Sequence, residues 1–565
     1  MVFKSVNKIA EILSRKGVKN IIISPGSRSA PLTLAFARHQ DLKKFIIPDE
    51  RSAGYIGVGM ARILNESVGL VCTSGTAVTN FFPALCEAYY QQIPLVVFTA
   101  DRPPEWIDQA DGQTIRQDNI FQSHVKGFFS FPLDYNHPDA DWYGERIVSE
   151  AVNLSIEFPS GPVHINIPLR EPLYPSSEET FHYPDIHRII NKIQVNQSIS
   201  EKSWDTLLKT WPRSGKILIV GGQQRSDDIF IKILDSFSSK YNIPVVGDVI
   251  SNLHKLNENL VSFQDLFLLS KNEKLLKSLQ PDLLITFGKS VISKNLKLFL
   301  RKFKPLHHWH IQPAGNVPDT FQSITTYIPT QPYTFFKEAL NENLPFCDQN
   351  YYLESWINID NISSKKVDTF FPANHFSELE ATQLIVQHLP EKINLHLANS
   401  MPVRLVNFFG KMKSAMEVFA NRGTSGIDGC NSTAVGIALQ SDILNVLITG
   451  DMAFIYDRNA FWHNYNPENL RIIILNNHGG GIFRMIDGPS SLPELETYFE
   501  TVQNLSAENT AKDYGFEYNF CRDRRTLQNR LKTFFISGKH LKILEIETES
   551  KTNKFIFDQF KSQFK

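Results

Sequence analysis

The chain has 565 residues, 42% hydrophobic and 21% charged, which fits about three or four domains of ordinary globular composition. Lys and Arg total 58 against 59 for Asp and Glu, which excludes a global attraction to nucleic acid or to an anionic membrane. Any recognition of anions must therefore come from basic residues gathered locally.

The cysteines and the first residues of the chain indicate the cellular compartment of the protein. The first ten residues contain two lysines and lack the apolar core of a signal peptide. No apolar run approaches the roughly 18 to 20 residues needed to cross a bilayer. We expect a cytoplasmic protein without membrane insertion, because the cysteines are unpatterned and form no CxxC pair. They are Cys72, Cys86, Cys347, Cys430 and Cys521.

The first 180 residues alternate short apolar runs with helix-like segments. Continuous apolar strands separated by helices predict a parallel sheet covered on both faces. The runs expected to be buried strands are 21–23, 45–47, 69–71, 95–98 and 163–167. The segments expected to be crossover helices are 31–38, 52–64 and 78–90.

The same alternation occurs twice more. A polar stretch at 174–200 predicts a linker, and a second polar stretch at about 341–374 separates the central block from the last one. The clearest later strands are expected at 217–220, 244–246, 283–287, 445–449 and 471–475. We therefore predict three successive doubly wound α/β domains at 1–180, 200–345 and 375–565.

Oxygen-bearing side chains follow two strands of the third domain. Asp451 comes directly after one strand, and 24 residues separate it from Asn476 and Asn477, which follow the next. Ligands bind beyond the carboxyl ends of parallel strands, and carboxylate, amide and carbonyl oxygens suit Mg²⁺. We predict a metal site at Asp451, Asn477 and Gly479, in a glycine run that lets backbone approach phosphates. Either pair alone is also typical of an ordinary turn or strand cap.

This pattern resembles the Gly-Asp-Gly…Asn-Asn signature of the thiamine-diphosphate-dependent enzymes, with Met452 in place of the second glycine. The resemblance implies thiamine diphosphate and Mg²⁺ or Mn²⁺ as cofactors. It also implies that Glu50, just past a strand of the first domain, bonds to the aminopyrimidine ring, and that Ile427 lies under the cofactor. The alternatives are that Glu50 stabilises a helix N-terminus and that Ile427 covers a core edge.

Five segments together resemble one family of these enzymes, the 2-succinyl-5-enolpyruvyl-6-hydroxy-3-cyclohexene-1-carboxylate synthases of the menaquinone pathway. The resemblance runs nearly end to end and is weakest in the central domain. It implies decarboxylation of 2-oxoglutarate and 1,4-addition of the product carbanion to isochorismate. The segments are SPGSRSAPL (24–32), TADRPPE (99–105), QTIRQ (113–117), GPVHIN (161–166) and NRGTSGIDG (421–429).

Both substrates are dicarboxylates, so a nearly neutral chain must gather several cations at the site, and arginine's planar fork suits carboxylates. Lys294 has the alternative of belonging to a solvated helix face. Gly112 and Asn295 depart from the family pattern. The residues that match isochorismate contacts are Ser27, Arg28, Arg102, Gln113 and Lys294. Those that match contacts to the acyl carboxylate or cover the pocket are Ser400, Arg404, Arg422, Ile482 and Phe483.

The family resemblance also implies a homodimer or homotetramer with the active site at the subunit interface, since the two ends of the cofactor are bound by different domains. One alternative function is that of an oxoacid decarboxylase or acetolactate synthase, which need fewer arginines. Another is a nucleotide-binding or scaffold protein, but GGQQRS (221–226) lacks the third glycine of the dinucleotide fingerprint.

Overall fold

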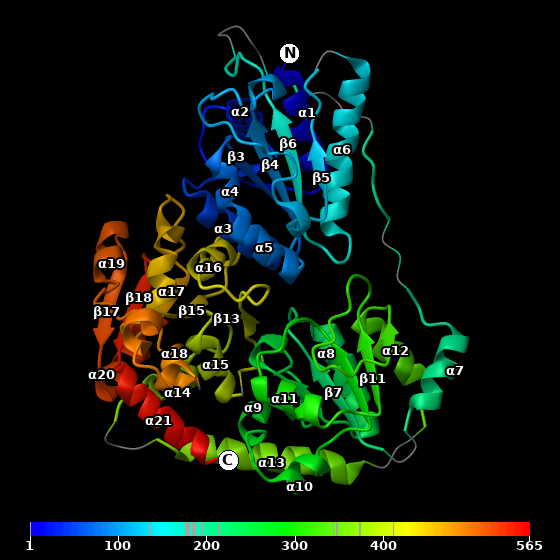
Figure 1. The fold of residues 1–565 in the computed structure, drawn as a ribbon, viewed down its shortest axis with the longest axis vertical. Helices are drawn as coiled ribbons and strands as arrows, with labels where there is room; N and C mark the ends of the chain where they lie inside the picture. The colour runs from blue at the N-terminus through cyan, green and yellow to red at the C-terminus, as the bar shows by residue number, and fades with distance from the viewer. Residues whose placement is uncertain are drawn as a thin grey trace.

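The computed structural model describes residues 2–134, 137–175, 181–183, 188–193, 195, 197–212, 215–342, 344–345, 349–371, 375–410, 412–486 and 488–565. Cys347 and parts of the expected linker lie outside these residues. The described chain forms three six-stranded sheets in which every pairing of strands is parallel. Figure 1 shows the first sheet above the other two. The predicted class of three successive α/β units is confirmed.

The first sheet carries helices on both faces, and its central strands are buried throughout. Its strands in spatial order are β2 (Lys43–Ile46), β1 (Asn20–Ile23), β3 (Val68–Cys72), β4 (Leu95–Asp101), β6 (Pro162–Pro168) and β5 (Phe128–Ser130). Its helices are α1 (Val2–Arg15), α2 (Ala30–Arg38), α3 (Glu50–Leu64), α4 (Thr76–Asn80), α5 (Phe82–Gln91) and α6 (Pro138–Ile156).

The expected helix over 78–90 is two helices. Pro83 lies in the first turn of α5, where its missing N–H would have no intrahelical partner in any case. The chain therefore starts a new helix at Phe82 instead of extending α4.

The second sheet has the same architecture. Its strands in order are β12 (Thr326–Ile328), β11 (His307–Ile311), β10 (Leu283–Phe287), β7 (Ile217–Gly221), β8 (Val245–Gly247) and β9 (Leu260–Val261). Its helices are α7 (Glu201–Thr210), α8 (Asp228–Tyr241), α9 (Gln264–Phe267), α10 (Glu273–Ser278), α11 (Lys294–Lys302) and α12 (Pro332–Asn341), followed by the long α13 (Asn350–Thr369).

The third sheet contains the strands that bear the expected metal site. Its order is β14 (Glu417–Phe419), β13 (Asn394–Leu397), β15 (Asn445–Gly450), β16 (Leu470–Asn476), β18 (Lys542–Glu547) and β17 (Glu517–Cys521). Its helices are α14 (Glu378–His388), α15 (Met401–Phe408), α16 (Cys430–Ala438), α17 (Asp451–Tyr456), α18 (Ile482–Met485), α19 (Glu508–Tyr514), α20 (Arg524–Phe534) and α21 (Ser550–Ser562). Within the described residues, no helix combines the length and apolar character needed to cross a membrane.

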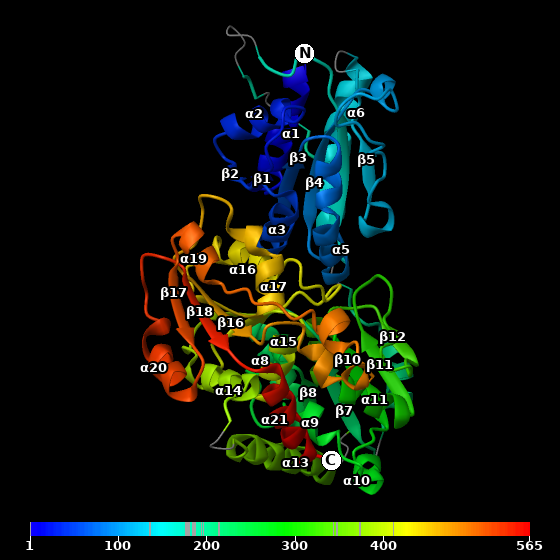
Figure 2. The same ribbon diagram turned by 60° about the vertical axis from the view of Figure 1, so that its left-hand side comes forward.

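The first and third sheets meet where α3 lies against α16 (Figures 1 and 2). A Cβ on Gly59 would lie 2.2 Å from the Thr433 carbonyl oxygen, and one on Gly436 would lie 2.1 Å from that of Ile56. Only glycine permits backbones this close. The contact fixes α16, and with it the loop before it that carries Arg422 and Ile427.

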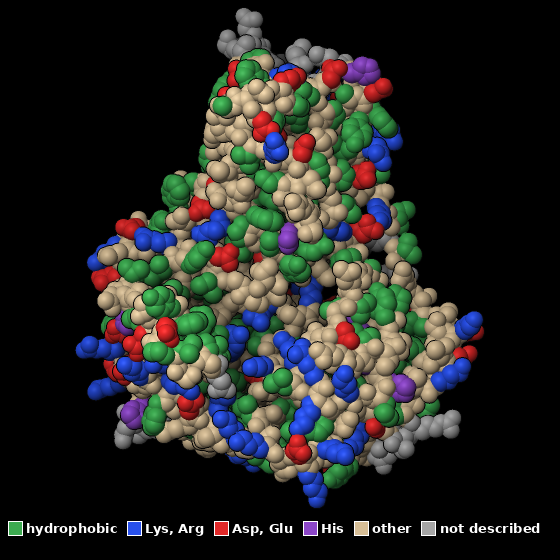
Figure 3. All heavy atoms as spheres, in the orientation of Figure 1, with side chains coloured by type: hydrophobic (Ala, Val, Ile, Leu, Met, Phe, Trp, Pro, Cys, Tyr) green, Lys and Arg blue, Asp and Glu red, His purple; other side chains and the backbone are tan. Residues whose placement is uncertain are grey.

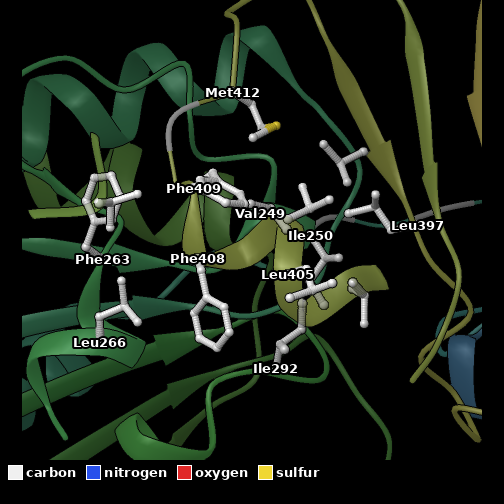
Figure 4. Close-up of a cluster of buried hydrophobic side chains, with 14 of the residues drawn as sticks. Val249, Ile250, Phe263, Leu266, Ile292, Leu397, Leu405, Phe408, Phe409 and Met412 are labelled. Atoms are coloured by element: carbon white, nitrogen blue, oxygen red, sulfur yellow. The ribbon is translucent and has the colours of Figure 1, made fainter. Parts of the chain in front are cut away.

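A shared hydrophobic cluster joins the second and third sheets (Figure 4). Leu405 and Phe408, on one side of α15, belong to the same buried cluster as Val249, Ile250 and Ile292 of the second unit. Burying these side chains contributes roughly 1.5 to 3 kcal/mol each. The packing sets the position of α15, which bears Arg404.

Candidate active site

The carboxyl ends of β15 and β16 lie side by side. Their parallel register pairs Gly450 with Leu475, so Asp451 and Asn477 both follow at the same edge of the third sheet. Asp451 begins α17 and is only 3% exposed. The adjacency predicted from the 24-residue spacing is therefore present.

The Asp451 carboxylate is held in a dry environment. Burial raises its pKa to about 6, although Gln503 and the backbone N–H groups of Met452 and Gly479 donate hydrogen bonds that act the other way. The bond from Gln503 Nε2 to Asp451 Oδ2 is 2.7 Å. A nearby divalent cation would favour the charged carboxylate.

Asn477 presents an unsatisfied oxygen beside this carboxylate. Its Nδ2 donates to Glu378 Oε1 at 2.6 Å, while Asn477 Oδ1 and Glu378 Oε2 are buried without a hydrogen-bond partner. Burial raises the pKa of Glu378 to about 8; the hydrogen bond from Asn477 opposes this effect, and the charge of Asp451 adds to it. Buried polar atoms normally have partners, so the unpaired oxygens fit a cation that this site would hold.

The donor set suits a hard cation that shares its ligands with a diphosphate. In the described part of the chain, no group of three or more His, Cys, Asp or Glu side chains could hold a metal ion. A metal here would thus depend on the Asp451 carboxylate, the Asn477 amide oxygen, a backbone carbonyl such as that of Gly479, and phosphate oxygens. This combination is typical of Mg²⁺ or Mn²⁺ bound with a phosphorylated cofactor.

The glycine run after Asn477 lets the backbone approach phosphates, and packing within the protein also leaves no room for side chains there. A Cβ on Gly479 would lie 2.6 Å from the Glu500 carbonyl oxygen, and one on Gly481 would lie 2.7 Å from Asn477 Nδ2. The segment around Glu500 accepts the Gly480 N–H at 2.7 Å and so covers the loop. The half-buried Ile482 and Phe483 begin α18 directly after it.

Two guanidinium groups lie near this edge without a carboxylate partner. Arg404 donates to the Ser400 carbonyl one turn earlier in α15, and Arg422 donates to Asn399 Oδ1 at 2.9 Å. Burial lowers the pKa of both, and the charge of Arg404 lowers that of Arg422 further. Among the described residues, neither forms an ion pair with Asp or Glu. Ser400, the N-cap of α15, has a φ of 74°.

The loop that carries Arg422 is anchored by the first unit. The buried Glu87, on α5, accepts the N–H groups of Gly423 at 2.8 Å and of Thr424 at 2.7 Å, and the Thr424 hydroxyl at 2.6 Å. Within the same loop Ile427 packs on a small apolar cluster formed by Ala398, Cys430 and Ala453. The loop is therefore fixed at one end by hydrogen bonds and at the other by packing.

Cations are concentrated locally although the chain has a net charge of −1. Figure 3 shows Lys and Arg side chains gathered around the hollow between the upper and lower parts of the molecule and below it. Lys294, at the start of α11, is exposed, whereas Lys297 is half-buried. Burial lowers the pKa of Lys297; Asp248 acts the other way, and the charge of Arg422 adds to the lowering. Lys297 is thus close enough to Arg422 for the two charges to interact, whereas Lys294 is exposed.

A second set of predicted residues lies at the carboxyl edge of the first sheet. The exposed Ser27 hydroxyl is 3.0 Å from that of Tyr174, and Arg28 donates to the Leu169 carbonyl at 3.0 Å. The Arg28 guanidinium is buried, with its Nε unpartnered, and its ion pair is with the exposed Glu171 at 3.5 Å.

Arg102 and Gln113 belong to the same edge. Arg102 pairs with Asp111 at 3.1 Å and donates to the Gly112 carbonyl at 2.8 Å. The exposed Gln113, with a φ of 54°, lies over the turn that follows β3, because a Cβ on Gly75 would be 3.3 Å from its backbone.

Glu50 occupies the first turn of α3, whose N-cap is Asp49. Its Oε2 accepts a long hydrogen bond of 3.4 Å from Asn80 Nδ2, and its charge adds to the effect of burial in raising the pKa of Cys72, at the end of β3. The helix N-terminus named as an alternative is thus its location, with Asp49 serving as the cap. Glu50 still points toward the strand ends.

The residues on either side of Glu50 contact the third unit: Asp49 Oδ2 accepts from Asn459 Nδ2 at 2.8 Å, and Arg51 pairs with Asp457 at 3.4 Å. The two groups of predicted residues are nevertheless not bonded to each other. Between described residues, no hydrogen bond or ion pair joins Glu50 or the cations beside it to Asp451, Asn477 or the Arg404–Arg422 pair. The arrowheads of β5 and β6 in Figure 1 point away from the other two sheets. The predicted residues are therefore brought together in two groups, with Lys294 in neither.

The departures from the family pattern have local structural consequences. A Cβ at Gly112 would meet nothing within 4 Å, so the glycine is not sterically required. Asn295 Nδ2 donates to the Asp265 carbonyl at 2.6 Å, so its side chain supports α9. Glu87, Glu378 and Gln503 were not identified from the sequence, because each acts on a residue far away in the chain.

Comparisons with known proteins show what this chain is similar to. The model for the thiamine pyrophosphate enzyme N-terminal TPP-binding domain matches residues 4–125, and that for the middle domain of thiamine pyrophosphate enzymes matches 187–397. A 2-succinyl-5-enolpyruvyl-6-hydroxy-3-cyclohexene-1-carboxylate synthase of Cytophaga hutchinsonii is 45% identical, with 99% of this chain and 98% of the relative covered. Synthases of the same name from Porphyromonas gingivalis and Flavobacterium johnsoniae are each 38% identical, and cover 96% and 98% of this chain and 94% and 97% of their own. The similarity extends over all three sheets.

Proposed function

The chain belongs to the family of 2-succinyl-5-enolpyruvyl-6-hydroxy-3-cyclohexene-1-carboxylate synthases, and we propose that it catalyses this family's reaction with the residues gathered at its two sheet edges. It is a thiamine-diphosphate-dependent transferase of menaquinone biosynthesis. In the proposed reaction 2-oxoglutarate loses CO₂, and its four-carbon remainder adds in a 1,4 sense to isochorismate.

The third sheet holds the diphosphate end of the cofactor. Asp451, the Asn477 amide oxygen and the Gly479 carbonyl bind the divalent cation, and Ile427 supports the cofactor from the apolar cluster behind it. When bound, thiamine diphosphate supplies a nucleophilic carbon and an electron sink for decarboxylation. Glu50 exchanges a proton with a nitrogen of the aminopyrimidine ring through its carboxylate oxygen.

Substrate recognition relies on the unpaired guanidiniums. Arg404 and Arg422, positioned by Ser400 and Asn399, bind the distal carboxylate of 2-oxoglutarate, and Ile482 and Phe483 exclude water above it. Ser27, Arg28, Arg102, Gln113 and Lys294 bind isochorismate. The observation that carries this proposal is the half-buried Arg404–Arg422 pair, because guanidiniums partly withdrawn from water without a protein carboxylate call for an anionic ligand.

The test is product analysis with 2-oxoglutarate, isochorismate, thiamine diphosphate and Mg²⁺, each omitted in turn. We expect the product of four-carbon addition to isochorismate only in the complete mixture. Replacing 2-oxoglutarate with pyruvate distinguishes the rival oxoacid decarboxylase or acetolactate synthase. Efficient use of pyruvate would contradict the proposed role of the arginine pair.

We also infer that each active site combines Glu50 of one copy with Asp451 of another, in a homodimer or in a homotetramer built as a dimer of dimers. This is supported by the bonding of Glu50: among the described residues its side chain has one long hydrogen bond, from Asn80 at 3.4 Å, and none to the cation-binding edge of the third sheet. The test is to co-express the inactive variants Glu50→Gln and Asp451→Asn. A mixed dimer then contains one intact site, whereas sites built within single chains would give no activity.

We propose that the protein acts in the cytoplasm. The four described cysteines, Cys72, Cys86, Cys430 and Cys521, are all free thiols. Free thiols are usual in a reducing compartment, which supports the cytoplasm as the site of action.

A further inference from the structure

We propose that Glu378 is a positioning residue that orients the side-chain amide of Asn477 so that its oxygen, and not its nitrogen, faces the cation. The inference rests on the proposed function, because it requires a divalent cation beside Asp451. Glu378 lies 99 residues from Asn477 in sequence and has no assigned role in the site.

An asparagine amide has two chemically different ends of nearly the same shape. Its oxygen can bind a cation, whereas its NH₂ group can only donate hydrogen bonds. Asn477 Nδ2 donates to Glu378 Oε1 at 2.6 Å, and Oδ1 is left buried without a partner. A flipped amide would place two oxygens in contact on one side and an NH₂ group against the cation on the other. The Glu378 carboxylate therefore favours the orientation that binds a metal.

Glu378 is itself firmly held. It is the first residue of α14, it is 3% exposed, and its backbone N–H donates to Asn553 Oδ1 at 2.9 Å. Asn553 Nδ2 in turn donates to the Thr548 hydroxyl at 2.9 Å. Because Glu378 is held rigidly, its carboxylate can set the orientation of the Asn477 amide.

The neighbouring residue Glu380 provides a matched control. It lies on the same turn of α14, is 4% exposed and pairs with Arg524. Replacing Glu380 removes a buried carboxylate from the same helix end without touching Asn477. Its variant therefore reports the structural cost of such a substitution alone.

The first experiment measures Mg²⁺ binding by titration calorimetry on the full chain with thiamine diphosphate present. Glu378→Gln keeps an oxygen acceptor for Asn477 and should retain Mg²⁺ affinity within a few-fold. Glu378→Leu removes the acceptor and should weaken binding by roughly 10- to 100-fold, the usual effect of losing a residue that orients a metal ligand. Glu380→Leu should lower the melting temperature and leave Mg²⁺ affinity unchanged.

The second experiment reverses the direction of the hydrogen bond. Asn477→Asp alone places two carboxylates in contact and should weaken Mg²⁺ binding. In the double variant Glu378→Gln/Asn477→Asp, the new amide donates to the new carboxylate and an oxygen still faces the cation, so binding should be largely restored. This variant keeps a hydrogen bond at the site and tests the inference even if Glu378→Leu does not fold.

The outcomes separate the two levels of the proposal. If the unaltered chain binds no Mg²⁺ with thiamine diphosphate, the cation site itself is wrong. If it binds Mg²⁺ but Glu378→Leu binds equally well, only the positioning role is overturned. Equal losses in Glu378→Gln and Glu378→Leu, or no recovery in the double variant, would also overturn it, because the charge and not the acceptor would then be decisive.

Discussion

Replacing Arg404 with alanine tests the role of the arginine pair in recognising the distal carboxylate of 2-oxoglutarate. Arg404 lies on α15, whose apolar side packs on the second unit, so the helix should stay in place when the guanidinium is removed. The lost side chain leaves no protein carboxylate unpaired among the described residues. The expected effect is therefore on substrate use and not on the fold.

The magnitude of the expected loss follows from the partial burial of the Arg404 guanidinium. Truncating one partner of a buried charge pair costs about 2 to 5 kcal/mol. Arg422 remains, held by Asn399 at 2.9 Å, and can still bind one carboxylate oxygen. We therefore expect the lower part of the range, about 2 to 3 kcal/mol, which is a roughly 30- to 150-fold loss in kcat/KM for 2-oxoglutarate.

The assay is kcat/KM for 2-oxoglutarate at saturating isochorismate, with 2-oxopentanoate as a comparison substrate that lacks the distal carboxylate. Arg404→Ala should lose most of its efficiency with 2-oxoglutarate and little with 2-oxopentanoate. The control Arg146→Ala removes an exposed arginine of α6 and should change neither. Equal losses on both substrates would refute the reasoning, because the lost energy would not involve the distal carboxylate.

Three further outcomes are expected. Glu50→Gln should leave the circular dichroism and melting temperature unchanged and lower turnover by roughly 10²- to 10⁴-fold; near-normal turnover would rule out its proton-exchange role. Glu87→Gln places an NH₂ group against one of the loop N–H groups that the carboxylate now accepts, and should lower the free energy of unfolding by about 1 to 3 kcal/mol. Amide hydrogen exchange over residues 421–429 should become faster. The exposed control Glu105→Gln should leave that exchange unchanged. Burial lowers the pKa of His164 to about 3. The contribution of this neutral imidazole to the free energy of unfolding is therefore complete above pH 6.5 and is lost as the pH falls toward 3. The free energy of unfolding should therefore drop by roughly 2 kcal/mol between pH 6.5 and 5 on its account, and a denaturant series with His164→Gln that showed the same slope would contradict this.

Much of the fold could be predicted from the sequence, because parallel strands buried on both faces leave continuous apolar runs. The adjacency of Asp451 and Asn477 followed from the same logic, since β15 and β16 are consecutive strands that pair directly. The break between α4 and α5 was missed because the apolar pattern continues through Phe81 and Phe82. The break is set by Pro83, which has no backbone N–H and is accommodated in the first turn of a new helix.

The supporting residues could not be predicted. Glu87 lies in the middle of α5, and Glu378 begins a helix remote from the metal residues in sequence. Their functions arise only when separate parts of the chain come together, so no local pattern marks them. Lys297 illustrates the same limit: the family resemblance pointed to Lys294 in α11, and only the rotation of the folded helix shows that Lys297 is half-buried near Arg422.

The two sheet edges also differ in how far a single chain completes them. At the third sheet Glu378, Gln503 and Glu87 hold the ligand-bearing groups in place, while Asn477 Oδ1 and Arg422 Nε stay buried and unsatisfied. Unsatisfied buried groups destabilise the fold by about 1 to 3 kcal/mol each, a cost that ligands offset on binding. At the first sheet the Glu50 side chain has one long hydrogen bond among the described residues. In the proposed dimer, the cation and diphosphate end of the site would thus be organised within one chain, whereas the ring end would acquire its environment from the opposite edge of a second copy.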